Sequence, residues 1–356
     1  MTQSFRQSMK GKVNTVLGPV NPDKLGLTLM HEHLFLGMDK YAFTPEEATQ
    51  RAWLDKPIAM DNLAAISERW KLNKASYHMY DEQTALEEVS AFAHQGGGTL
   101  VDVTSIGCGR DPLALARISR ATRLNIVMGG SYYVPIYHPA DIAERSEDSL
   151  AEEIVRDVTV GVGDTGVRSG IIGEVGCFWP LTDNQRKTFR ASAQAYHATG
   201  APILVHPGFD MTAPETLLRI LTDAGVPPGR VVIGHLDFFF DYGFLKSLAQ
   251  TGCYLEFDTF GLEDTSNAVT NAPKDIERSS DTQRMERLEF LINEGFLDRI
   301  VISHDVCWTF RYTRNGGKSY DHVPRMVVPR MERRGFTGDQ IRTILHDNPR
   351  DVLTFS

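Results

Sequence analysis

The sequence predicts a (β/α)8 barrel (TIM barrel) with a long insertion after the first strand. Eight short apolar runs recur along the 356 residues, and a segment with helical periodicity follows each run. Such runs are typical of parallel strands buried on both faces, and eight alternations favour a closed barrel. The alternative is an open doubly wound sheet. It is disfavoured because no G-x-G-x-x-G follows the first strand.

The first strand is indicated by leucines at positions 25, 27 and 29, which lead into His31 and His33. A polar and aromatic stretch, residues 38–80, follows with short helical segments, and we expect it to lie over the end of this strand. Residues 81–94 then predict a helix with apolar side chains on one side. Three glycines, at 96–98, predict where that helix ends.

The other seven strands are expected where short apolar runs are bounded by polar residues or glycine. They are residues 99–104, 125–129, 170–175, 202–206, 230–235, 254–258 and 299–303. Helices are expected at 112–123, 146–158, 184–199, 212–224, 244–250, 282–294 and 338–346. No linker interrupts the pattern, so residues 1–356 are expected to form a single domain.

Composition narrows the class of protein. A formal charge of -9 and a pI near 5.7 argue against nucleic acid or an anionic membrane as the main partner. Residues 1–12 lack the apolar core of a secretory signal, and no run approaches the ~18 apolar residues of a membrane span. The four cysteines form no C-x-x-C, which is typical of free thiols in a reducing compartment. We therefore expect a cytoplasmic protein with a small-molecule substrate.

His31 and His33 form the motif on which the functional prediction rests. Side chains alternate along a strand, so the two imidazoles should share one face while Glu32 takes the other. Two neutral imidazoles on one face can bind one metal ion. The alternative is a strand with two hydrogen-bonded histidines, and it stands unless ligands also end other strands.

Further potential ligands do end other strands, where the carboxyl ends of a barrel meet. The six candidates are His31, His33, Glu174, His206, His235 and Asp305. Six side chains exceed the four ligands of a closed tetrahedral zinc site, so they suit two divalent ions, expected to be zinc. A bridging carboxylate and a bridging hydroxide would complete such a centre, and Asp305 could also accept the proton of the attacking water.

Ser303, His304 and Asp305 place three triad residue types in a row. On a strand they should not form a triad, because His304 would face away from the other two.

These motifs resemble the phosphotriesterase family of the amidohydrolase superfamily, closest to the phosphotriesterase-related proteins. The resemblance runs from residue 11 to 349 through Met30-His31-Glu32-His33-Leu34, Gly170-Ile171-Ile172-Gly173-Glu174, His206, Gly234-His235-Leu236-Asp237 and Ser303-His304-Asp305. It implies that His31, His33 and Asp305 hold the more buried metal, that His206 and His235 hold the more exposed one, and that Glu174 bridges. Many members bridge with a carboxylated lysine one residue earlier, where this chain has Gly173.

The resemblance implies a binuclear hydrolase that cleaves a carboxyl-derived bond, an N-acyl amide or a lactone or ester, with a small anionic compound as a candidate substrate. Phosphotriesterase activity is one alternative, and a catalytically silent ligand-binding barrel is another. Tyr133 is expected to contact substrate, although it could simply pack in its loop. Arg311 could clamp a carboxylate or sulfonate, although it could equally be a solvated loop residue. Barrels of this family are often dimers, so a homodimer is the expected assembly.

Overall fold

The barrel strands form two parallel sheets. In the computed structural model, which describes residues 2–41, 44–68, 73–263 and 279–356, a five-stranded sheet has the order β12-β11-β10-β9-β8, and a three-stranded sheet has the order β3-β6-β7. The strands are β3 (Leu27–Glu32), β6 (Gly97–Asp102), β7 (Asn125–Met128), β8 (Ile172–Gly176), β9 (Ile203–His206), β10 (Val231–Ile233), β11 (Tyr254–Phe257) and β12 (Ile300–Ile302). The predicted barrel is confirmed.

Backbone hydrogen bonds join the two sheets at both seams. At one seam Gly170 N donates to Met128 O (2.8 Å), and at the other Asp305 N donates to His31 O (3.1 Å). The second bond lies at the predicted site, because it joins His31 and Asp305, which are both candidate metal ligands. Closure of the barrel therefore brings the first and last strands together where the site was expected.

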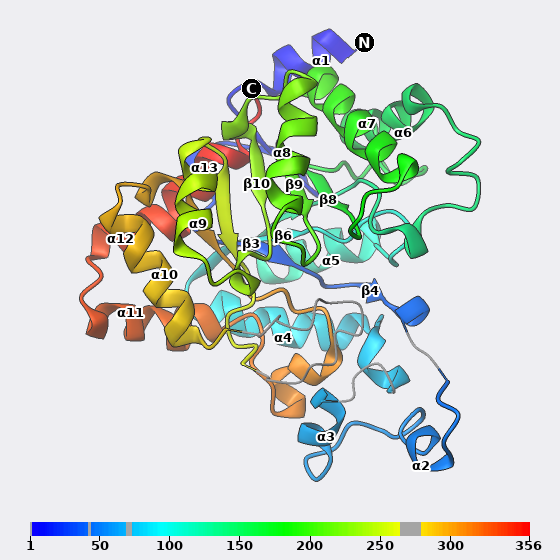
Figure 1. Ribbon diagram of the computed structural model, residues 1–356, viewed down its shortest axis with the longest axis vertical. Helices are drawn as coiled ribbons and strands as arrows, with labels where there is room; N and C mark the ends of the chain where they lie inside the picture. The colour runs from blue at the N-terminus through cyan, green and yellow to red at the C-terminus, as the bar shows by residue number, and fades with distance from the viewer. Residues whose placement is uncertain (1, 42–43, 69–72, 264–278) are drawn as a thin grey trace.

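Helices surround the strands (Figure 1). They are α4 (Glu82–His94), α5 (Pro112–Thr122), α6 (Glu147–Thr159), α7 (Asp183–Thr199), α8 (Ala213–Asp223), α9 (Tyr242–Gln250), α10 (Asp281–Asn293), α11 (Val328–Arg334), α12 (Gly338–Arg342) and α13 (Asn348–Leu353). Seven predicted helices are confirmed to within two residues at each end. The eighth, predicted at 338–346, is wrong in its second half, because a π-helical turn (Thr343–Asp347) follows α12 and leads into α13.

Two apolar clusters stabilise the barrel. The larger one joins the outward faces of the strands to the helices. The smaller one contains Val101, Leu204, Val232 and Val301, each from a different strand, and Ile171, which directly precedes β8, and all five are fully buried. Within these strands its members alternate with residues of the larger cluster, as inward and outward positions of a barrel strand do. The carboxyl ends of the strands, which carry the candidate ligands, therefore lie above an apolar core.

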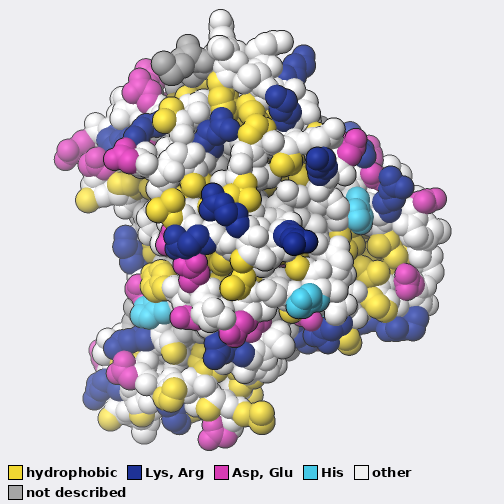
Figure 2. Space-filling model, turned by 180° about the vertical axis from the view of Figure 1, so that it is seen from behind, with side chains coloured by type: hydrophobic (Ala, Val, Ile, Leu, Met, Phe, Trp, Pro, Cys, Tyr) yellow, Lys and Arg dark blue, Asp and Glu magenta, His cyan; other side chains and the backbone are white. Residues whose placement is uncertain are grey.

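The insertion packs at the carboxyl end of the barrel, as predicted. Its ends pair as short strands, β4 (Leu36–Gly37) with β5 (His78–Met79). Between them lie α2 (Ala48–Arg51) and α3 (Leu63–Glu68), which form a small lobe away from the strands in Figure 1 and below the main body in Figure 2. Thr309, after the last barrel strand, donates to Ala75 O (2.6 Å). Residues 42–43 and 69–72 of the insertion lie outside the described residues.

The N-terminal segment holds elements that the sequence did not predict. Helix α1 (Thr2–Met9) packs on α7, and β1 (Val13–Thr15) pairs with β2 (Gly18–Val20). Arg6 donates to Ser356 O (3.1 Å), so both chain ends lie together in Figure 1. Within the part of the chain that the structure describes, no helix combines the length and hydropathy of a membrane span. All four cysteines are buried free thiols, as expected.

Candidate metal centre

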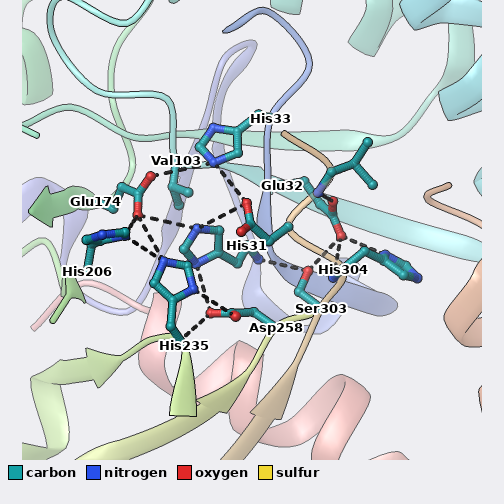
Figure 3. Close-up of polar contacts among 12 residues, drawn as sticks. His31, Glu32, His33, Val103, Glu174, His206, His235, Asp258, Ser303 and His304 are labelled. Carbon is teal, nitrogen blue, oxygen red and sulfur yellow. Dashed lines mark hydrogen bonds and ion pairs between the residues drawn. The ribbon is translucent and has the colours of Figure 1, made fainter. Parts of the chain in front are cut away.

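The structure brings the six predicted ligands together around Glu174 (Figure 3). On one side, His31 Nε2 and His33 Nε2 each lie 3.5 Å from an oxygen of Glu174. Asp305 Oδ1 lies 3.4 Å from His33 Nε2 and 4.0 Å from His31 Nε2. Two histidines and two carboxylates thus converge on one point, the grouping expected for the more buried ion.

A second group lies on the other side of the same carboxylate. His206 Nδ1 is 3.2 Å and His235 Nε2 is 3.6 Å from Glu174 Oε2. The two imidazole nitrogens are 2.6 Å apart. Because each carboxylate oxygen of Glu174 faces ligand nitrogens, this residue occupies the position of a bridge between two groups.

The donor atoms fit divalent metal ions. His31 Nε2, Glu174 Oε2 and Asp305 Oδ1 are buried and have no hydrogen-bond partner among the described residues. Buried polar atoms without partners are costly, and one common explanation is an ion at the site. Imidazole nitrogen with carboxylate oxygen is a donor set that suits zinc and related transition metals. The residues present therefore fit the predicted pair of ions.

Two of these ligands have an unusual backbone. His235 has φ = 56° and Asp305 has φ = 50°, both in the left-handed region that β-carbon-bearing residues seldom adopt. Such conformations cost about 1–3 kcal/mol and persist where the surroundings enforce them. Each turns the chain just after its strand. This turn aims the side chain of His235 at Glu174 and that of Asp305 at His33.

Glu174 follows a glycine whose position admits no side chain. Gly173 has φ = 155°, and a Cβ there would lie 2.6 Å from Leu204 O of the neighbouring strand. A lysine at this position would therefore displace β9. The structure thus gives a steric reason why a lysine does not fit at residue 173.

Two buried carboxylates contact the ring nitrogens of His31 and His235 that face away from Glu174. His31 Nδ1 lies 3.0 Å from Glu256 Oε2, and His235 Nδ1 lies 2.9 Å from Asp258 Oδ1. Holding the rear nitrogen of a histidine fixes its tautomer and ring orientation. Sequence reasoning did not single out Glu256 or Asp258. Two acids at alternate positions of the apolar run 254–258 were the pattern that could have indicated them.

Neighbouring groups in the cluster have opposite pKa shifts. Burial alone would lower the pKa of His31, but carboxylates around it, above all Glu256 and Asp258, raise it well above its usual value. Burial alone would raise the pKa of Glu174, but the charge of His31 and the close approach of His206 lower it well below its usual value. Both shifts favour the charged form of the group, as in any close ion pair, and several strongly perturbed groups in one buried place are a candidate functional site.

Tyr133 lies at the cluster, where the sequence placed it. Its hydroxyl is 3.4 Å from His206 Nδ1, and its ring stands edge-on to the imidazole with the centroids 4.9 Å apart. Tyr41, from the insertion, packs in the same wall against Tyr137 and Phe178. An aromatic wall beside the more exposed ligands is a surface on which a small substrate could lie.

Arg311 does not lie where the predicted substrate clamp requires. The residue is 2% exposed, and its guanidinium donates to three backbone carbonyls, those of Lys318 (3.1 Å), His304 (3.1 Å) and Phe260 (2.9 Å). A side chain held in this way fixes the loops around the site and offers no free fork to a ligand. We therefore correct the prediction and assign Arg311 to the framework of the site.

His304 is also placed differently from the prediction. Strand β12 ends at Ile302, so strict alternation does not extend to the next residues. Ser303 Oγ and His304 Nδ1 both lie 2.7 Å from Glu32 Oε1, on the same side of the chain. The residues nevertheless form no triad, because the Asp305 carboxylate approaches His33.

Comparison with known proteins agrees with this geometry. A model of the phosphotriesterase family matches residues 11–353. The chain belongs to the phosphotriesterase family. N-acetyltaurine hydrolase of Rattus norvegicus is 38% identical over 350 residues, which cover 98% of this chain and 99% of the relative. Phosphotriesterase-related protein of Nematostella vectensis is 40% identical over 349 residues, which cover 97% and 99%.

One solved structure has nearly the same backbone as this chain. The resiniferatoxin-binding protein from Rhodobacter sphaeroides superposes with a TM-score of 0.92 at 34% identity, covering 96% of this chain and 95% of that one. The resemblance drawn from the motifs is confirmed, and as a phosphotriesterase-family protein the chain is a hydrolase.

Proposed function

We propose that this phosphotriesterase-family hydrolase uses a binuclear metal centre to cleave the amide bond of a small N-acylated, anionic amine of the N-acetyltaurine type. The observation that carries this proposal is the cluster of candidate ligands around Glu174, in which the buried atoms His31 Nε2, Glu174 Oε2 and Asp305 Oδ1 have no hydrogen-bond partner among the described residues. The substrate class is supported by the N-acetyltaurine hydrolases, which match 98% of the chain at 38% identity. Lactones and carboxylate esters are carboxyl-derived substrates of the same chemistry.

The chain's own residues have distinct roles in this proposal. His31, His33 and Asp305 would hold one ion, His206 and His235 the other, and Glu174 both. Bound divalent ions, expected to be zinc, would supply a Lewis acid and a water activated near neutral pH.

Two side chains would act on the reactants themselves. Asp305 would hold the ion through its unpartnered Oδ1 and could accept a proton from attacking water on its other carboxylate oxygen. The Tyr133 hydroxyl, beside His206, can hold a polar group of the substrate.

A substrate panel tests the proposal. The metal-loaded protein is assayed with N-acetyltaurine, an uncharged N-acyl amide of the same length, a γ-lactone and a neutral phosphotriester. We expect the highest kcat/KM with the anionic amide and the lowest with the phosphotriester. A phosphotriester that outperforms every carboxyl-derived substrate would overturn the ranking.

A ligand-binding role is the second candidate, since the solved structure with a TM-score of 0.92 is named as a binding protein. Saturable binding of a panel compound without turnover by the metal-loaded protein would favour it. The cytoplasmic location, the homodimer and the single domain over residues 1–356 remain proposals. Free thiols at all four cysteines support the first of these.

A further inference from the structure

Glu32 points away from the two histidines that flank it. His31 and His33 face Glu174, whereas the carboxylate of Glu32 turns toward Ser303 and His304 (Figure 3). Glu32 is fully buried. A buried carboxylate persists only where its surroundings supply donors and charge, so its partners indicate what it does.

Its partners enclose Asp305 from both sides. His304 N donates to Glu32 Oε1 (3.0 Å), and Val306 N donates to Glu32 Oε2 (3.1 Å). The amide between them, that of Asp305, donates to His31 O (3.1 Å). Three consecutive amides are thus bound by residues 31 and 32. This grip fixes the backbone on either side of the left-handed Asp305.

Two further side chains tighten the arrangement. The Ser303 hydroxyl donates to Glu32 Oε1 (2.7 Å) and accepts from His31 N (3.0 Å). His304 Nε2 accepts from Val323 N (2.8 Å), so it carries no proton. Nδ1 is therefore the protonated nitrogen, and it donates to Glu32 Oε1 (2.7 Å). Every donor that meets this carboxylate is itself fixed by the strands or the following loop.

Arg311 supplies positive charge to the same arrangement. Its guanidinium is buried, and it donates to His304 O (3.1 Å), the carbonyl that precedes Asp305. Burial lowers the pKa of Arg311, while the charge of Glu32 is among those that raise it. Arg311 therefore holds the carbonyl of the peptide before Asp305, while Glu32 holds the amides of the residues on either side of Asp305.

From this geometry we infer that Glu32 is the positioning residue for Asp305: its carboxylate bridges the amides of His304 and Val306 and thereby holds Asp305 in the left-handed turn that aims it at His33. This inference rests on the proposed metal-dependent function, because it assigns a purpose to the aim of Asp305. Glu32 acts through Asp305 and contacts no substrate.

Glu88 offers a matched control. Its carboxylate bridges two amides in the same way, accepting from Thr313 N (2.8 Å) and Arg314 N (3.0 Å), and the residue is 5% exposed. It holds a later part of the same loop, away from the ligand cluster. Glu32→Gln and Glu88→Gln therefore remove the same chemistry, and only the first disturbs the turn at Asp305.

The experiment compares Glu32→Gln, Glu88→Gln, the milder Ser303→Ala and the wild type. Titration of the metal-free proteins with Co²⁺, followed by the visible spectrum, measures binding without turnover. We expect Glu32→Gln to weaken one Co²⁺ about 10- to 100-fold and to lower kcat by a similar factor with little change in KM. Ser303→Ala should also weaken Co²⁺ binding and lower kcat, but by smaller factors. Glu88→Gln should lower the thermal midpoint only.

A double-mutant cycle tests whether Glu32 acts through Asp305. The fold-loss in kcat of the double variant Glu32→Gln/Asp305→Asn should be much smaller than the product of the fold-losses of the two single variants. Both changes disable the same unit, so their effects should not multiply. Losses that multiply would overturn the inference, as would Co²⁺ binding and kcat in Glu32→Gln equal to those of Glu88→Gln. Either result leaves the proposed function intact, because the proposed function is tested by the substrate panel with the wild-type protein.

Discussion

His206 Nδ1 and His235 Nε2 face each other across 2.6 Å, and both also approach Glu174 Oε2. At this separation two imidazole nitrogens can share a proton or a cation, and imidazole is a preferred ligand of divalent transition metals. We expect elemental analysis of the gently purified protein to find close to two metal ions per chain. Less than one ion, with no gain on adding zinc, manganese or cobalt, would contradict the binuclear centre.

His235→Asn should reduce this metal content toward one ion, because it removes a ligand from one group only. The control is His197→Asn, since His197 is exposed on helix α7 and its Nε2 lies 2.8 Å from Ala224 O at the end of α8. Equal metal content in both variants would mean that His235 is not a ligand.

Asp305→Asn tests the proton acceptor. The amide keeps an oxygen that can face His33, but it cannot take up a proton at neutral pH. We expect most of the metal to remain and kcat to fall about 100-fold or more. Near-full activity would contradict the general-base role. Glu174→Gln should differ from it by weakening both ions, since Glu174 faces both groups.

Tyr133→Phe tests the substrate contact. The change removes the hydroxyl 3.4 Å from His206 and leaves the ring in place. We expect kcat/KM to fall about 10-fold, the factor for one lost hydrogen bond of about 1.4 kcal/mol, without loss of stability. Tyr132→Phe is the control, because the hydroxyl of that fully buried neighbour donates to Glu153 (2.6 Å), outside the ligand cluster. Equal losses in both variants would make Tyr133 a packing residue.

Arg311→Met tests the corrected role of this arginine. Three carbonyls lose their donor, so the free energy of unfolding should fall by roughly 2–5 kcal/mol. Denaturant unfolding measures this change. KM for an anionic amide and for a neutral ester should change alike. A rise confined to the anionic substrate would restore the clamp that the sequence suggested.

Asp281 links stability to pH at some distance from the ligands. Burial alone would raise its pKa, but a hydrogen bond with His322 and the charge of Arg284 lower it below the usual value. A lowered folded-state pKa stabilises the fold above the unfolded-state value, and this contribution is lost as pH falls below about 4. Denaturant midpoints from pH 7 to pH 3 should show Asp281→Asn less stable than wild type, with the gap narrowing below about pH 4. A gap independent of pH would contradict this linkage.

The strands and the ligand set could be predicted because both follow from local patterns. Apolar runs identify buried parallel strands, and polar residues directly after those runs must meet at one mouth once the barrel closes. His206 and His235, 29 positions apart, are brought within hydrogen-bonding distance by this rule alone. The same reasoning applied to all six predicted ligands.

Other features depended on geometry that no local pattern carries. Arg311 could face a ligand or backbone carbonyls, and only the course of the loops decides between them. His304 was assigned the wrong direction because β12 ends two residues before it. Glu256 and Asp258 were overlooked because their purpose appears only when His31 and His235 are seen in front of them.

The crowding around Gly173 bears on how centres of this kind could interconvert during evolution. A lysine there would collide with Leu204 O, 2.6 Å from its Cβ, and would still leave Glu174 in place. A single substitution therefore cannot exchange one bridge for the other. A centre bridged by Glu174 also takes both bridging oxygens from an encoded side chain, so its assembly does not depend on dissolved carbon dioxide, which a lysine must capture before it can bridge.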